Sequence, residues 1–462
     1  MINNKYRLSA ATFLFAGLSI VAVAGMAYTC TDLHLGVATD KLFVFTCLVM
    51  FSFLGAVLVW REYRRLDYAV FALLLTSAAM LLRVALFDYK SGDYLACLQY
   101  WYEDIERRGG FSAIAYKVGN YNVPYLYFIA AISYLDVPNL YLYKLFSVLW
   151  DVILAWGCLR LVRVVAGDEK PLASLTAFSI ALLLPTAYMN SALWAQCDAI
   201  YAALCAHAVS KALQKENKVS VALVAVAFSF KLQTVFLLPF WGVLWVSGRV
   251  KFQELFVFPA TYLLTILPAV LLGKPVKDIV GVYFGQLGEY PQLTLKAPNA
   301  YQFIPYGFQC DEKLVGRIGI AAAVVLVVVL LGLAYKCKDK LDNEMLLKMA
   351  VLLCVGVPFF LPHMHERYFF LADIFTLCLA CTNFRFAPIA ILTEFSSRAC
   401  YFAYFTGKRN YLLQLRNLYF PMGVEALAML TALTLTSVTL VVQLKKGMNN
   451  SGKFRFSLRR RH

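Results

Sequence analysis

The stretch Ser91-Gly92-Asp93-Tyr94 stands just beyond an apolar run that ends near Phe87, and it opens a loop that extends to about Leu140. Apolar runs of roughly 17–25 residues, each long enough to cross a bilayer as a helix, recur along the whole chain on both sides of this loop. The stretch therefore marks the point where a membrane span gives way to a large loop. It places the Asp93 carboxylate at a membrane surface.

The composition agrees with a membrane protein. Hydrophobic residues make up 61% of the 462 residues, and only 15% are charged. A soluble domain of this size has no means of burying that much apolar surface, so the bilayer must act as the solvent. We expect an all-α polytopic membrane protein, a helical bundle of about 14 transmembrane helices without a separate soluble domain.

The net charge of +16 is distributed in a way that argues against nucleic acid as the partner. Basic residues cluster in alternate short loops, a pattern that marks those loops as cytoplasmic. The clustered residues are Arg61, Arg64, Arg65, Arg160, Arg163, Lys170, Lys211, Lys215, Lys218, Arg249, Lys251, Lys336, Lys338, Lys340 and Lys348. Residues 444–462 form a basic tail on the same side, which can also touch anionic lipid. The loops 88–140 and 274–313 are then expected outside.

Two short helices are expected within the first outer loop. Residues 92–108 combine aromatic side chains at helical spacing with acidic side chains, which is typical of a helix lying in the membrane interface. Residues 124–135 are apolar but reach only about half of a bilayer crossing, so they predict a surface or re-entrant helix. Residues 1–66 precede this region as an additional transmembrane hairpin.

Asp93 is the leading candidate for a group that takes a proton. An aspartate in an outer loop is usually only solvated, but Asp93 is followed by the aromatic segment and then by a Pro-marked stretch that contains Asn122 and Tyr125. Aromatic faces suit both lipids and sugars. With Tyr94, these residues indicate an acceptor surface or cavity, and Asp88 is the rival carboxylate.

Two polar interruptions of apolar sequence are candidates for the same cavity. Trp194, Gln196 and Asp198 stand where a span begins, and there an acidic residue can also serve simply as a first-turn partner of the helix dipole. Lys231 and Gln233 stand near the outer end of another apolar run, where a lysine can also extend to the surface. Both readings stay open, because polar groups at membrane depth also tend to line functional cavities.

The segment His363-Met364-His365-Glu366-Arg367 lies between two apolar runs and is the sharpest candidate site. One histidine at a helix end is usually structural, but two histidines, a glutamate and an arginine within one short segment favour a function. The spacing is not the i,i+4 pattern of zinc-binding helices, and a third ligand would have to come from elsewhere. We therefore expect no cofactor, with a divalent metal as the less favoured alternative. Arginine is suited to gripping a phosphate through paired hydrogen bonds.

Taken in order, these motifs resemble those of the GT-C glycosyltransferases. The segments that carry the resemblance are Gly92-Asp93-Tyr94, Tyr121-Asn122-Val123-Pro124-Tyr125, Trp194-Ala195-Gln196-Cys197-Asp198, Lys231-Leu232-Gln233 and His363-Met364-His365-Glu366-Arg367. The similarity is closest to the dolichyl-phosphate-glucose-dependent glucosyltransferases and to bacterial membrane proteins grouped with GPI mannosyltransferases. It covers roughly residues 67–385, which it identifies as a GT-C-like catalytic core. Residues 386–443 then form C-terminal transmembrane helices.

The resemblance implies an inverting transfer of a monosaccharide from a polyprenyl- or dolichyl-phosphate donor to a glycan or glycolipid acceptor at the non-cytoplasmic face. In the family the acid of the first outer loop is the general base, a role that falls on Asp93. The histidine-rich motif lies near the donor phosphate, and this role falls on His363, His365, Glu366 and Arg367. We add Lys231 and Gln233 to the donor set because of their charge and polarity.

The chain departs from the glucosyltransferase pattern at Arg367, where that pattern has lysine; the positive charge is preserved. The residues around Gln196 match the bacterial group better, which leaves the choice between mannose and glucose open and favours a bacterial inner membrane over the endoplasmic reticulum. The competing classes are a polysaccharide polymerase and a lipid-linked oligosaccharide flippase. A flippase is expected to line a path with charges on several helices, and a polymerase to use paired outer-loop arginines.

Overall fold

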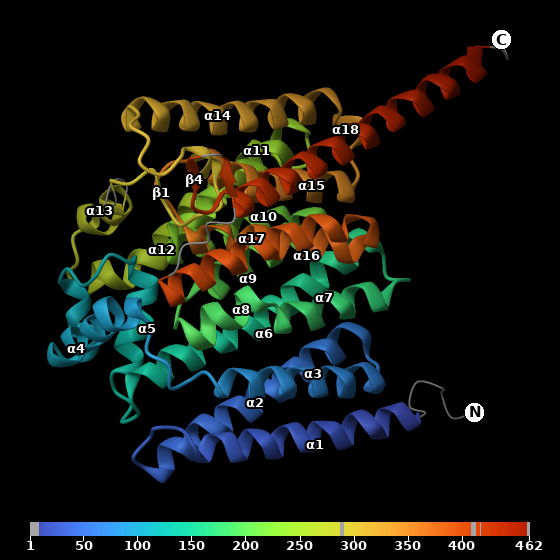
Figure 1. Ribbon diagram of the computed structural model, residues 1–462. Coiled ribbons are helices and arrows are strands. Elements are labelled where there is room, and N and C mark those ends of the chain that lie inside the picture. Colours follow the sequence, from blue (N-terminus) through green and yellow to red (C-terminus); the bar gives the residue numbers. More distant parts are fainter. Residues whose placement is uncertain (1–8, 287–290, 408–412, 416, 460–462) are drawn as a thin grey trace.

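The computed structural model describes residues 9–286, 291–407, 413–415 and 417–459, and these are almost entirely helical (Figure 1). The α-helices are α1 (Ala10–Thr31), α2 (Ala38–Tyr63), α3 (Leu66–Val84), α4 (Gln99–Arg107), α5 (Val123–Ile132), α6 (Asn139–Ala166), α7 (Pro171–Leu183), α8 (Pro185–Tyr188), α9 (Asp198–Leu213), α10 (Asn217–Phe230), α11 (Pro239–Val246), α12 (Val257–Leu271), α13 (Val276–Gln286), α14 (Glu312–Lys336), α15 (Asn343–Phe360), α16 (Phe370–Thr382), α17 (Ala387–Thr406) and α18 (Gly423–Arg459). The strands are β1 (Thr294–Leu295), β2 (Met364–His365), β3 (Leu413–Leu415) and β4 (Leu418–Phe420).

Within the described residues, eight helices are long and apolar enough to cross a membrane, and the protein is a multi-pass membrane protein. A ninth span is obtained if α7 and the segment 185–193 count as one span bent by 42°. The predicted count of about 14 is not confirmed, because several expected spans are short helices. For example, α9 has 16 residues, α10 has 14 and α16 has 13, whereas a straight crossing needs about 20.

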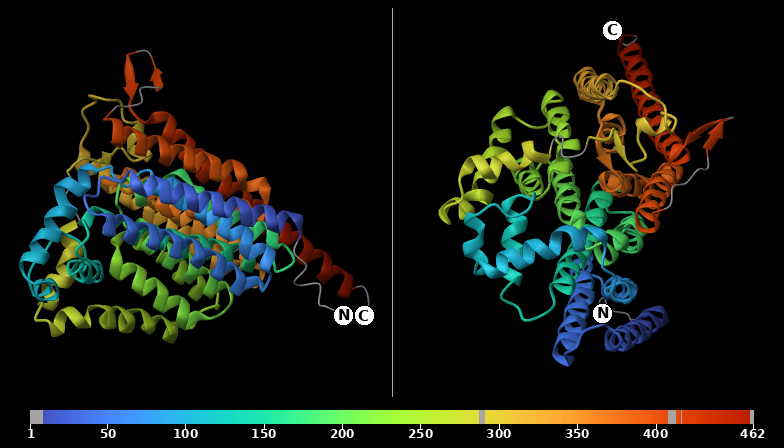
Figure 2. Two further views of the ribbon diagram at one scale, coloured as in Figure 1. Left: turned by 90° about the horizontal axis from the view of Figure 1, so that it is seen from below. Right: turned by 60° about the vertical axis from the view of Figure 1, so that its left-hand side comes forward.

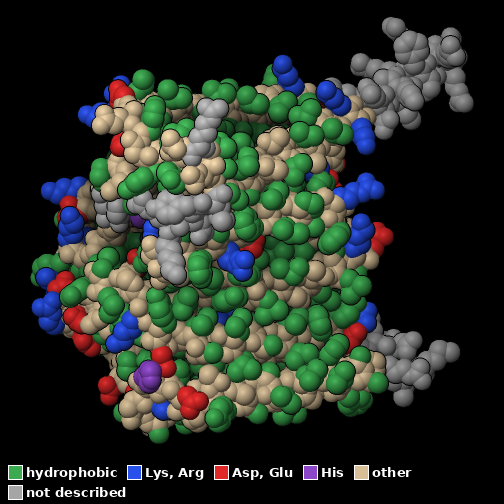
Figure 3. Space-filling model, in the orientation of Figure 1, with side chains coloured by type: hydrophobic (Ala, Val, Ile, Leu, Met, Phe, Trp, Pro, Cys, Tyr) green, Lys and Arg blue, Asp and Glu red, His purple; other side chains and the backbone are tan. Residues whose placement is uncertain are grey.

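The long helices lie side by side and share one apolar core that extends from Met26 to Leu444 (Figures 1 and 2). The hairpin of α1 and α2 forms one edge of the bundle and packs on α3, and α2 also packs on α6. Apolar side chains cover most of the visible flank of the bundle, whereas the charged side chains gather mainly towards its two ends (Figure 3). This distribution is expected when the flank faces lipid.

The large loops collect at one end of the bundle. Figure 1 shows α4, α5, α13 and β1 together at this end, while α1 begins and α18 runs out at the opposite end. The first loop contains α4 and α5, which overlap the two short helices expected at 92–108 and 124–135. Residues 444–459 continue α18 as a helix, so the tail predicted from residue 444 starts in regular structure.

Helix breaks occur where the local sequence forbids continuation. Leu184 precedes Pro185 and takes an extended conformation, which ends α7. The chain then passes through a π-helical turn, η4 (Met189–Leu193), and a second π-helical turn, η2 (Tyr94–Leu98), follows directly after Asp93. Such turns are rare and often mark functional sites. Both lead into the loops that carry the candidate residues.

The apolar segment 219–248, long enough for one tilted span or two short ones, is divided into three short helical pieces. Helix α10 ends at Phe230, Lys231 is extended, and the short 3₁₀ turn η5 (Leu232–Phe236) precedes α11. A broken helix inside a bundle is stable where the freed backbone groups are buried in protein or line a cavity. The broken helix is therefore consistent with a cavity beside Lys231.

Candidate active site

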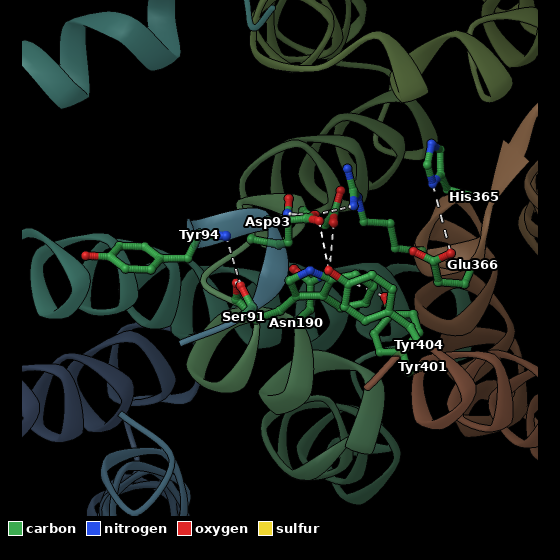
Figure 4. Close-up of polar contacts among 12 residues, drawn as sticks. Ser91, Asp93, Tyr94, Asn190, His365, Glu366, Tyr401 and Tyr404 are labelled. Atoms are coloured by element: carbon green, nitrogen blue, oxygen red, sulfur yellow. Dashed lines mark hydrogen bonds and ion pairs between the residues drawn. The ribbon is translucent and has the colours of Figure 1, made fainter. Parts of the chain in front are cut away.

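The loop that carries Asp93 is fixed to the rest of the bundle through Ser91. The Ser91 hydroxyl donates to the carbonyl oxygen of Trp194 at 2.8 Å and accepts from the backbone N–H of Tyr94 at 3.1 Å (Figure 4). These two bonds hold the residues on either side of Asp93. The carboxylate is consequently presented at the start of η2 in a defined direction.

Three elements from distant parts of the chain donate hydrogen bonds to Asp93. Oδ2 accepts from Nη1 of Arg367 at 2.8 Å and from Nε2 of Gln196 at 2.7 Å, and Oδ1 accepts from the Tyr404 hydroxyl at 2.8 Å. Burial alone would raise the pKa of Asp93, but the Arg367 charge and the hydrogen bond from Tyr404 outweigh burial and hold this pKa below 3.8. Asp93 is therefore ionised at neutral pH.

The second candidate segment reaches this place through a very short parallel sheet. Strand β2 pairs with β1, with Thr294 opposite Met364 and Leu295 opposite His365, and the 3₁₀ turn η9 (Glu366–Phe369) follows. The pairing aligns the backbone so that Arg367 meets Asp93 and Glu366 is buried. The loop of Asp93 and the segment 363–367 therefore converge on one place.

Burial shifts the pKa values of His365 and Glu366, which precede Arg367, in the direction that favours the neutral form of each. Burial and the Arg367 charge lower the pKa of His365 to about 3, so the imidazole is neutral at pH 7 and can donate only one N–H. Burial raises the pKa of Glu366 to about 7. Among the described residues no hydrogen-bond partner faces Oε1 of Glu366.

Three residues beside the site hold a left-handed backbone conformation without being glycine. Ala195 has φ 63°, Lys296 has φ 57° and His363 has φ 63°. Ala195 turns the chain so that Gln196 faces Asp93, and His363 is held by hydrogen bonds from its backbone N–H to Leu293 and from its ring to Gln292. Left-handed residues with a Cβ cost energy and concentrate at functional sites, where the surrounding structure enforces them.

Two cavities meet at this cluster. The first cavity has a volume of about 380 Å³ and is lined by Lys231, Gln233, His363 and Tyr283 among others. The second cavity has a volume of about 290 Å³ and contains Asp93 in its wall. The residues that line both cavities are Asn120, Tyr121, His365 and Arg367.

The two cavities differ in their surroundings. Val235 and Ile320 line the first cavity and are 40% and 46% exposed on the outside of the bundle, so this cavity adjoins the apolar flank. The second cavity is lined by aromatic and polar side chains, including Trp101, Gln196 and Tyr404, and lies among the loops. The first cavity therefore borders the lipid-facing surface, whereas Val235 and Ile320 do not line the second cavity.

Lys231 lines the first cavity and forms a buried ion pair with Asp198. Asp198 also accepts from Nδ2 of Asn190 at 2.7 Å. The Lys231 ammonium lies 5.5 Å from the centre of the Tyr121 ring. Gln233 lines the same cavity, and its Oε1 has no hydrogen-bond partner among the described residues. Lys231 and Gln233 thus line a cavity and are not exposed at the protein surface.

Several sequence candidates have structural roles instead. Asp88 accepts from the Tyr141 hydroxyl at 2.5 Å and from the backbone N–H of His34 at 3.1 Å, and it lines neither cavity. The Tyr94 ring points away from Asp93, and its hydroxyl donates to Asn139 at 2.6 Å (Figure 4). The expectation that Asp88 competes with Asp93 as base therefore loses its geometric support.

Three aromatic or amide candidates pack around the cavities. Tyr125 is fully buried between the rings of Tyr121 and Tyr143 and lines neither cavity. Asn122 lines the first cavity but is bound on both sides: Oδ1 caps α5, and Nδ2 donates to the Tyr283 hydroxyl at 2.7 Å. Trp194 stacks on Tyr404 with ring centres 4.1 Å apart. This stacking helps to hold Tyr404, the tyrosine whose hydroxyl donates to Asp93, in place.

Tyr404 is the residue that the sequence motifs miss. It lies on α17, outside the segment 67–385 that carries the resemblance, and no charged motif surrounds it. Lys296 is also missed, although it lines the second cavity and donates from Nζ to the carbonyl oxygen of Ala403 at 3.1 Å. Tyrosine is common near membrane surfaces, so nothing in the sequence distinguishes Tyr404 from its neighbours.

The described residues contain no group of three or more His, Cys, Asp or Glu side chains that could hold a metal ion. The two histidines of the 363–367 segment are directed differently, since His363 bonds the backbone of Gln292 and His365 faces both cavities. No family model and no curated protein matches this chain. The chemistry of the site must therefore be argued from its own geometry.

Proposed function

We propose that this protein is an integral-membrane inverting glycosyltransferase with a GT-C-like core. It moves a hexose from a polyprenyl- or dolichyl-phosphate donor to a glycan or glycolipid acceptor, with Asp93 as general base. The observation that carries the proposal is the wall shared by the two cavities. There Arg367 and His365 lie between a space that adjoins the apolar flank and a space that contains Asp93.

A transferase that joins a lipid-borne sugar to a second sugar needs two spaces that meet at the reacting atoms. The first cavity has an apolar edge at Val235 and Ile320 and a cation at Lys231, which suits a lipid phosphate. The second cavity offers Trp101 and Tyr404, and aromatic faces of this kind suit a sugar ring. The anomeric carbon would then lie near the shared wall.

The reaction needs one proton acceptor and one leaving group. The acceptor hydroxyl attacks the anomeric carbon, the bond from that carbon to the phosphate oxygen breaks with its electron pair leaving on the phosphate, and the hydroxyl proton passes to Asp93. The pKa of Asp93 below 3.8 keeps it ionised, and each carboxylate oxygen has two lone pairs, so Oδ1 can accept from the acceptor hydroxyl as well as from Tyr404. A positioned base of this kind contributes roughly 10²–10⁴ to the rate.

The departing phosphate gains negative charge as the bond breaks. Arg367 and Lys231 border the first cavity, and a neutral His365 can add one N–H donor. Before a donor binds, both cations are already paired with the carboxylates Asp93 and Asp198. Fixed charges aimed at developing charge stabilise the transition state more than the substrate, and this is often the largest catalytic contribution.

The side of the membrane follows from the positions of the charged loops. Helix α2 runs towards Arg61, Arg64 and Arg65 at one end of the bundle, and α3 returns from there to the loop of Asp93 at the other end. Basic loops favour the cytoplasm, so the site faces the periplasm or lumen in this proposal. We assign the protein to a bacterial inner membrane on the sequence resemblance.

The direct test uses purified full-length protein in lipid nanodiscs with a panel of polyprenyl-phosphate monosaccharides and glycolipid acceptors. We expect one donor to be consumed, with the product linkage inverted relative to the donor by NMR. Asp93→Asn should abolish transfer while Asp88→Asn, which disturbs only the Tyr141 and His34 contacts, should retain it. Retained turnover in Asp93→Asn protein, or loss only in Asp88→Asn protein, would falsify the assignment of the base.

A further inference from the structure

Helix α17 has one long side that the described part of the chain leaves uncovered. The helix has 20 residues, about the length of a bilayer crossing, and it packs on α16 and α18. On its free side Ile391, Phe395 and Phe402 are 65%, 38% and 54% exposed. Arg398 is exposed as well, and the four residues follow one another at intervals of four, three and four positions. This spacing places them on one stripe along the helix, the α17 stripe.

Arg398 puts a cation into the apolar flank of the bundle. It lies about 12 Å from the outer end of α17 at Thr406, at a rise of 1.5 Å per residue. Figure 3 shows basic and acidic side chains in the middle of the flank, over the part that α17 occupies in Figure 1. Charged side chains at membrane depth are costly, and they nearly always face protein or water. A cation on a lipid-facing stripe therefore calls for a partner.

The described residues leave Arg398 without a counter-charge in contact. Its neighbour one helical turn back is Glu394, which is turned towards α8. There the two carboxylate oxygens of Glu394 accept from the backbone N–H of Thr186 at 3.0 Å and from its hydroxyl at 2.7 Å. None of the ion pairs within 4.0 Å that form among the described residues includes Arg398. The guanidinium thus points out of the bundle.

The direction of α17 works against an extension of Arg398 to the nearer membrane surface. Tyr404, close to the C-terminus of the helix, contacts Asp93, so α17 ends at the outer surface and begins at the opposite one. The Cα–Cβ bonds of a helix tilt towards its N-terminus. The Arg398 side chain therefore starts away from the outer surface, and residues 387–397 separate it from the other surface. Only basic side chains near helix ends reach the interface easily.

We propose that the α17 stripe is the contact surface between two copies of this chain, in which Arg398 of each copy pairs with the partner's Glu394. The stripe is self-complementary, because it carries Arg398 and is flanked one turn away by a carboxylate. Glu394 is only partly buried, and each of its oxygens keeps a second lone pair beside the bond from Thr186. A lipid chain offers no such counter-charge.

The spacing of the stripe fits this pairing. Two copies with the same orientation in the membrane are related by a two-fold axis along the membrane normal, which places the two α17 helices parallel to each other. Alternating intervals of four and three residues are the pattern by which parallel helices interlock. Since Arg398 leans one turn towards the N-terminus, its guanidinium reaches the level of the partner's Glu394. The contact uses no residue of the candidate active site, so it is independent of the proposed function.

The first experiment counts subunits. Full-length protein with one fluorophore on each chain is reconstituted in vesicles of phosphatidylcholine and phosphatidylglycerol, and photobleaching steps are counted while the protein is diluted in lipid. We expect two steps for the wild-type protein. In Arg398→Leu the dimerisation constant should fall at least about tenfold, because each dimer loses two ion pairs at membrane depth. Arg398→Lys keeps the charge and should keep most of the dimer.

The matched control is Arg317→Leu, which removes an exposed arginine from α14 and should leave dimerisation unchanged. A single step for the wild-type protein at every protein-to-lipid ratio overturns the proposal. Two steps that persist equally in Arg398→Leu overturn it as well, since the contact would then lie on another surface.

The second experiment locates the contact. A photo-crosslinking p-benzoylphenylalanine at Phe402 should join two α17 segments, as mass spectrometry of mixed isotope-labelled copies can show. The same group at Val328, which is 59% exposed on α14, should not. Glu394→Gln keeps an acceptor for Thr186 but removes the charge, and it should weaken dimerisation as Arg398→Leu does. Crosslinks from Phe402 to lipid alone, or a dimer that Glu394→Gln leaves at full strength, would refute the pairing.

Discussion

Arg367 donates to Asp93 at 2.8 Å although 274 positions separate the two residues in the chain. This ion pair joins the loop after α3 to the turn before α16. Among the described residues, the carboxylates that line the second cavity are Asp93 and Glu366, and the cation lies against Asp93. The same guanidinium also borders the first cavity. One side chain therefore sets the protonation state of the candidate base and faces the space proposed for the donor.

The first prediction concerns the acidic limb of the pH profile. Since Arg367 is the main influence that lowers the pKa of Asp93, Arg367→Ala should raise this pKa above 3.8 and move the acidic loss of kcat/KM to higher pH. Arg367→Lys keeps the charge and should leave the limb near its original place. The measurement is kcat/KM between pH 4 and 8 for both variants, and an unchanged limb in Arg367→Ala contradicts the prediction.

A second prediction addresses Tyr404. Tyr404→Phe removes one hydrogen bond to the Asp93 carboxylate and should lower kcat/KM about tenfold to hundredfold, the usual value of a hydrogen bond to a charged group. Tyr401→Phe on the same helix is the control, because the Tyr401 hydroxyl contacts Asn190 and not Asp93. Equal losses in the two variants would show that the tyrosine acts through packing alone.

The third prediction follows from Glu366, whose pKa is raised from 4.5 to about 7 by burial. The folded protein keeps this proton between pH 4.5 and 7 whereas the unfolded chain releases it, so stability should fall as pH rises through this window. The full difference is about 3 kcal/mol. Glu366→Gln should flatten this dependence, which thermal unfolding at pH 4.5, 6 and 7.5 can measure. A slope that persists in the variant would assign the effect to another group.

A fourth prediction separates the structural and functional roles of Lys231. Lys231→Met leaves Asp198 buried without its cation, which should cost about 3–5 kcal/mol of stability, while the double variant Lys231→Met/Asp198→Asn should recover much of this loss. If Lys231 also faces the donor phosphate, the recovered double variant should still show a raised donor KM. A double variant with normal donor KM would limit Lys231 to a structural role.

The fifth prediction uses two glycines with positive φ. A Cβ at Gly119 would lie 2.6 Å from the Trp101 ring in the wall of the second cavity, whereas a Cβ at Gly167 would meet nothing within 4 Å. Gly167→Ala should cost only backbone strain of about 1–3 kcal/mol, and Gly119→Ala should additionally weaken acceptor binding by displacing Trp101. Thermal unfolding and acceptor KM distinguish the two effects.

The sequence leads to the candidate site because charged residues are conspicuous in an apolar chain. Asp93 and the 363–367 segment stand out against membrane spans, and their convergence is a consequence of the bundle placing both loops at one end. The same argument does not predict Tyr404, because tyrosine is common near membrane surfaces and does not stand out from its neighbours there. The Arg367–Asp93 ion pair is also not predicted from the sequence, because a phosphate-binding site predicts an arginine without a carboxylate partner.

The predicted count of about 14 spans is not confirmed, and the reason is physical. Hydropathy reports which residues avoid water, and it does not distinguish a full crossing from a short buried helix beside a cavity. The break at Lys231 illustrates this, because the largely apolar stretch from α10 to α11 is interrupted at Lys231 and Gln233, and both of these residues line the first cavity. Apolar sequence alone therefore does not determine the number of spans where short helices lie beside a cavity.

The left-handed backbone at Ala195, Lys296 and His363 has a consequence for any attempt to engineer this protein. Screens for heat resistance favour substitutions that relax such positions, and glycine or asparagine would do so at each of them. The same substitutions would let Gln196 and the strand pair β1–β2 drift from the orientation that aligns them with Asp93. Selection for thermal stability should therefore favour substitution at these three positions, whereas selection for turnover should disfavour it.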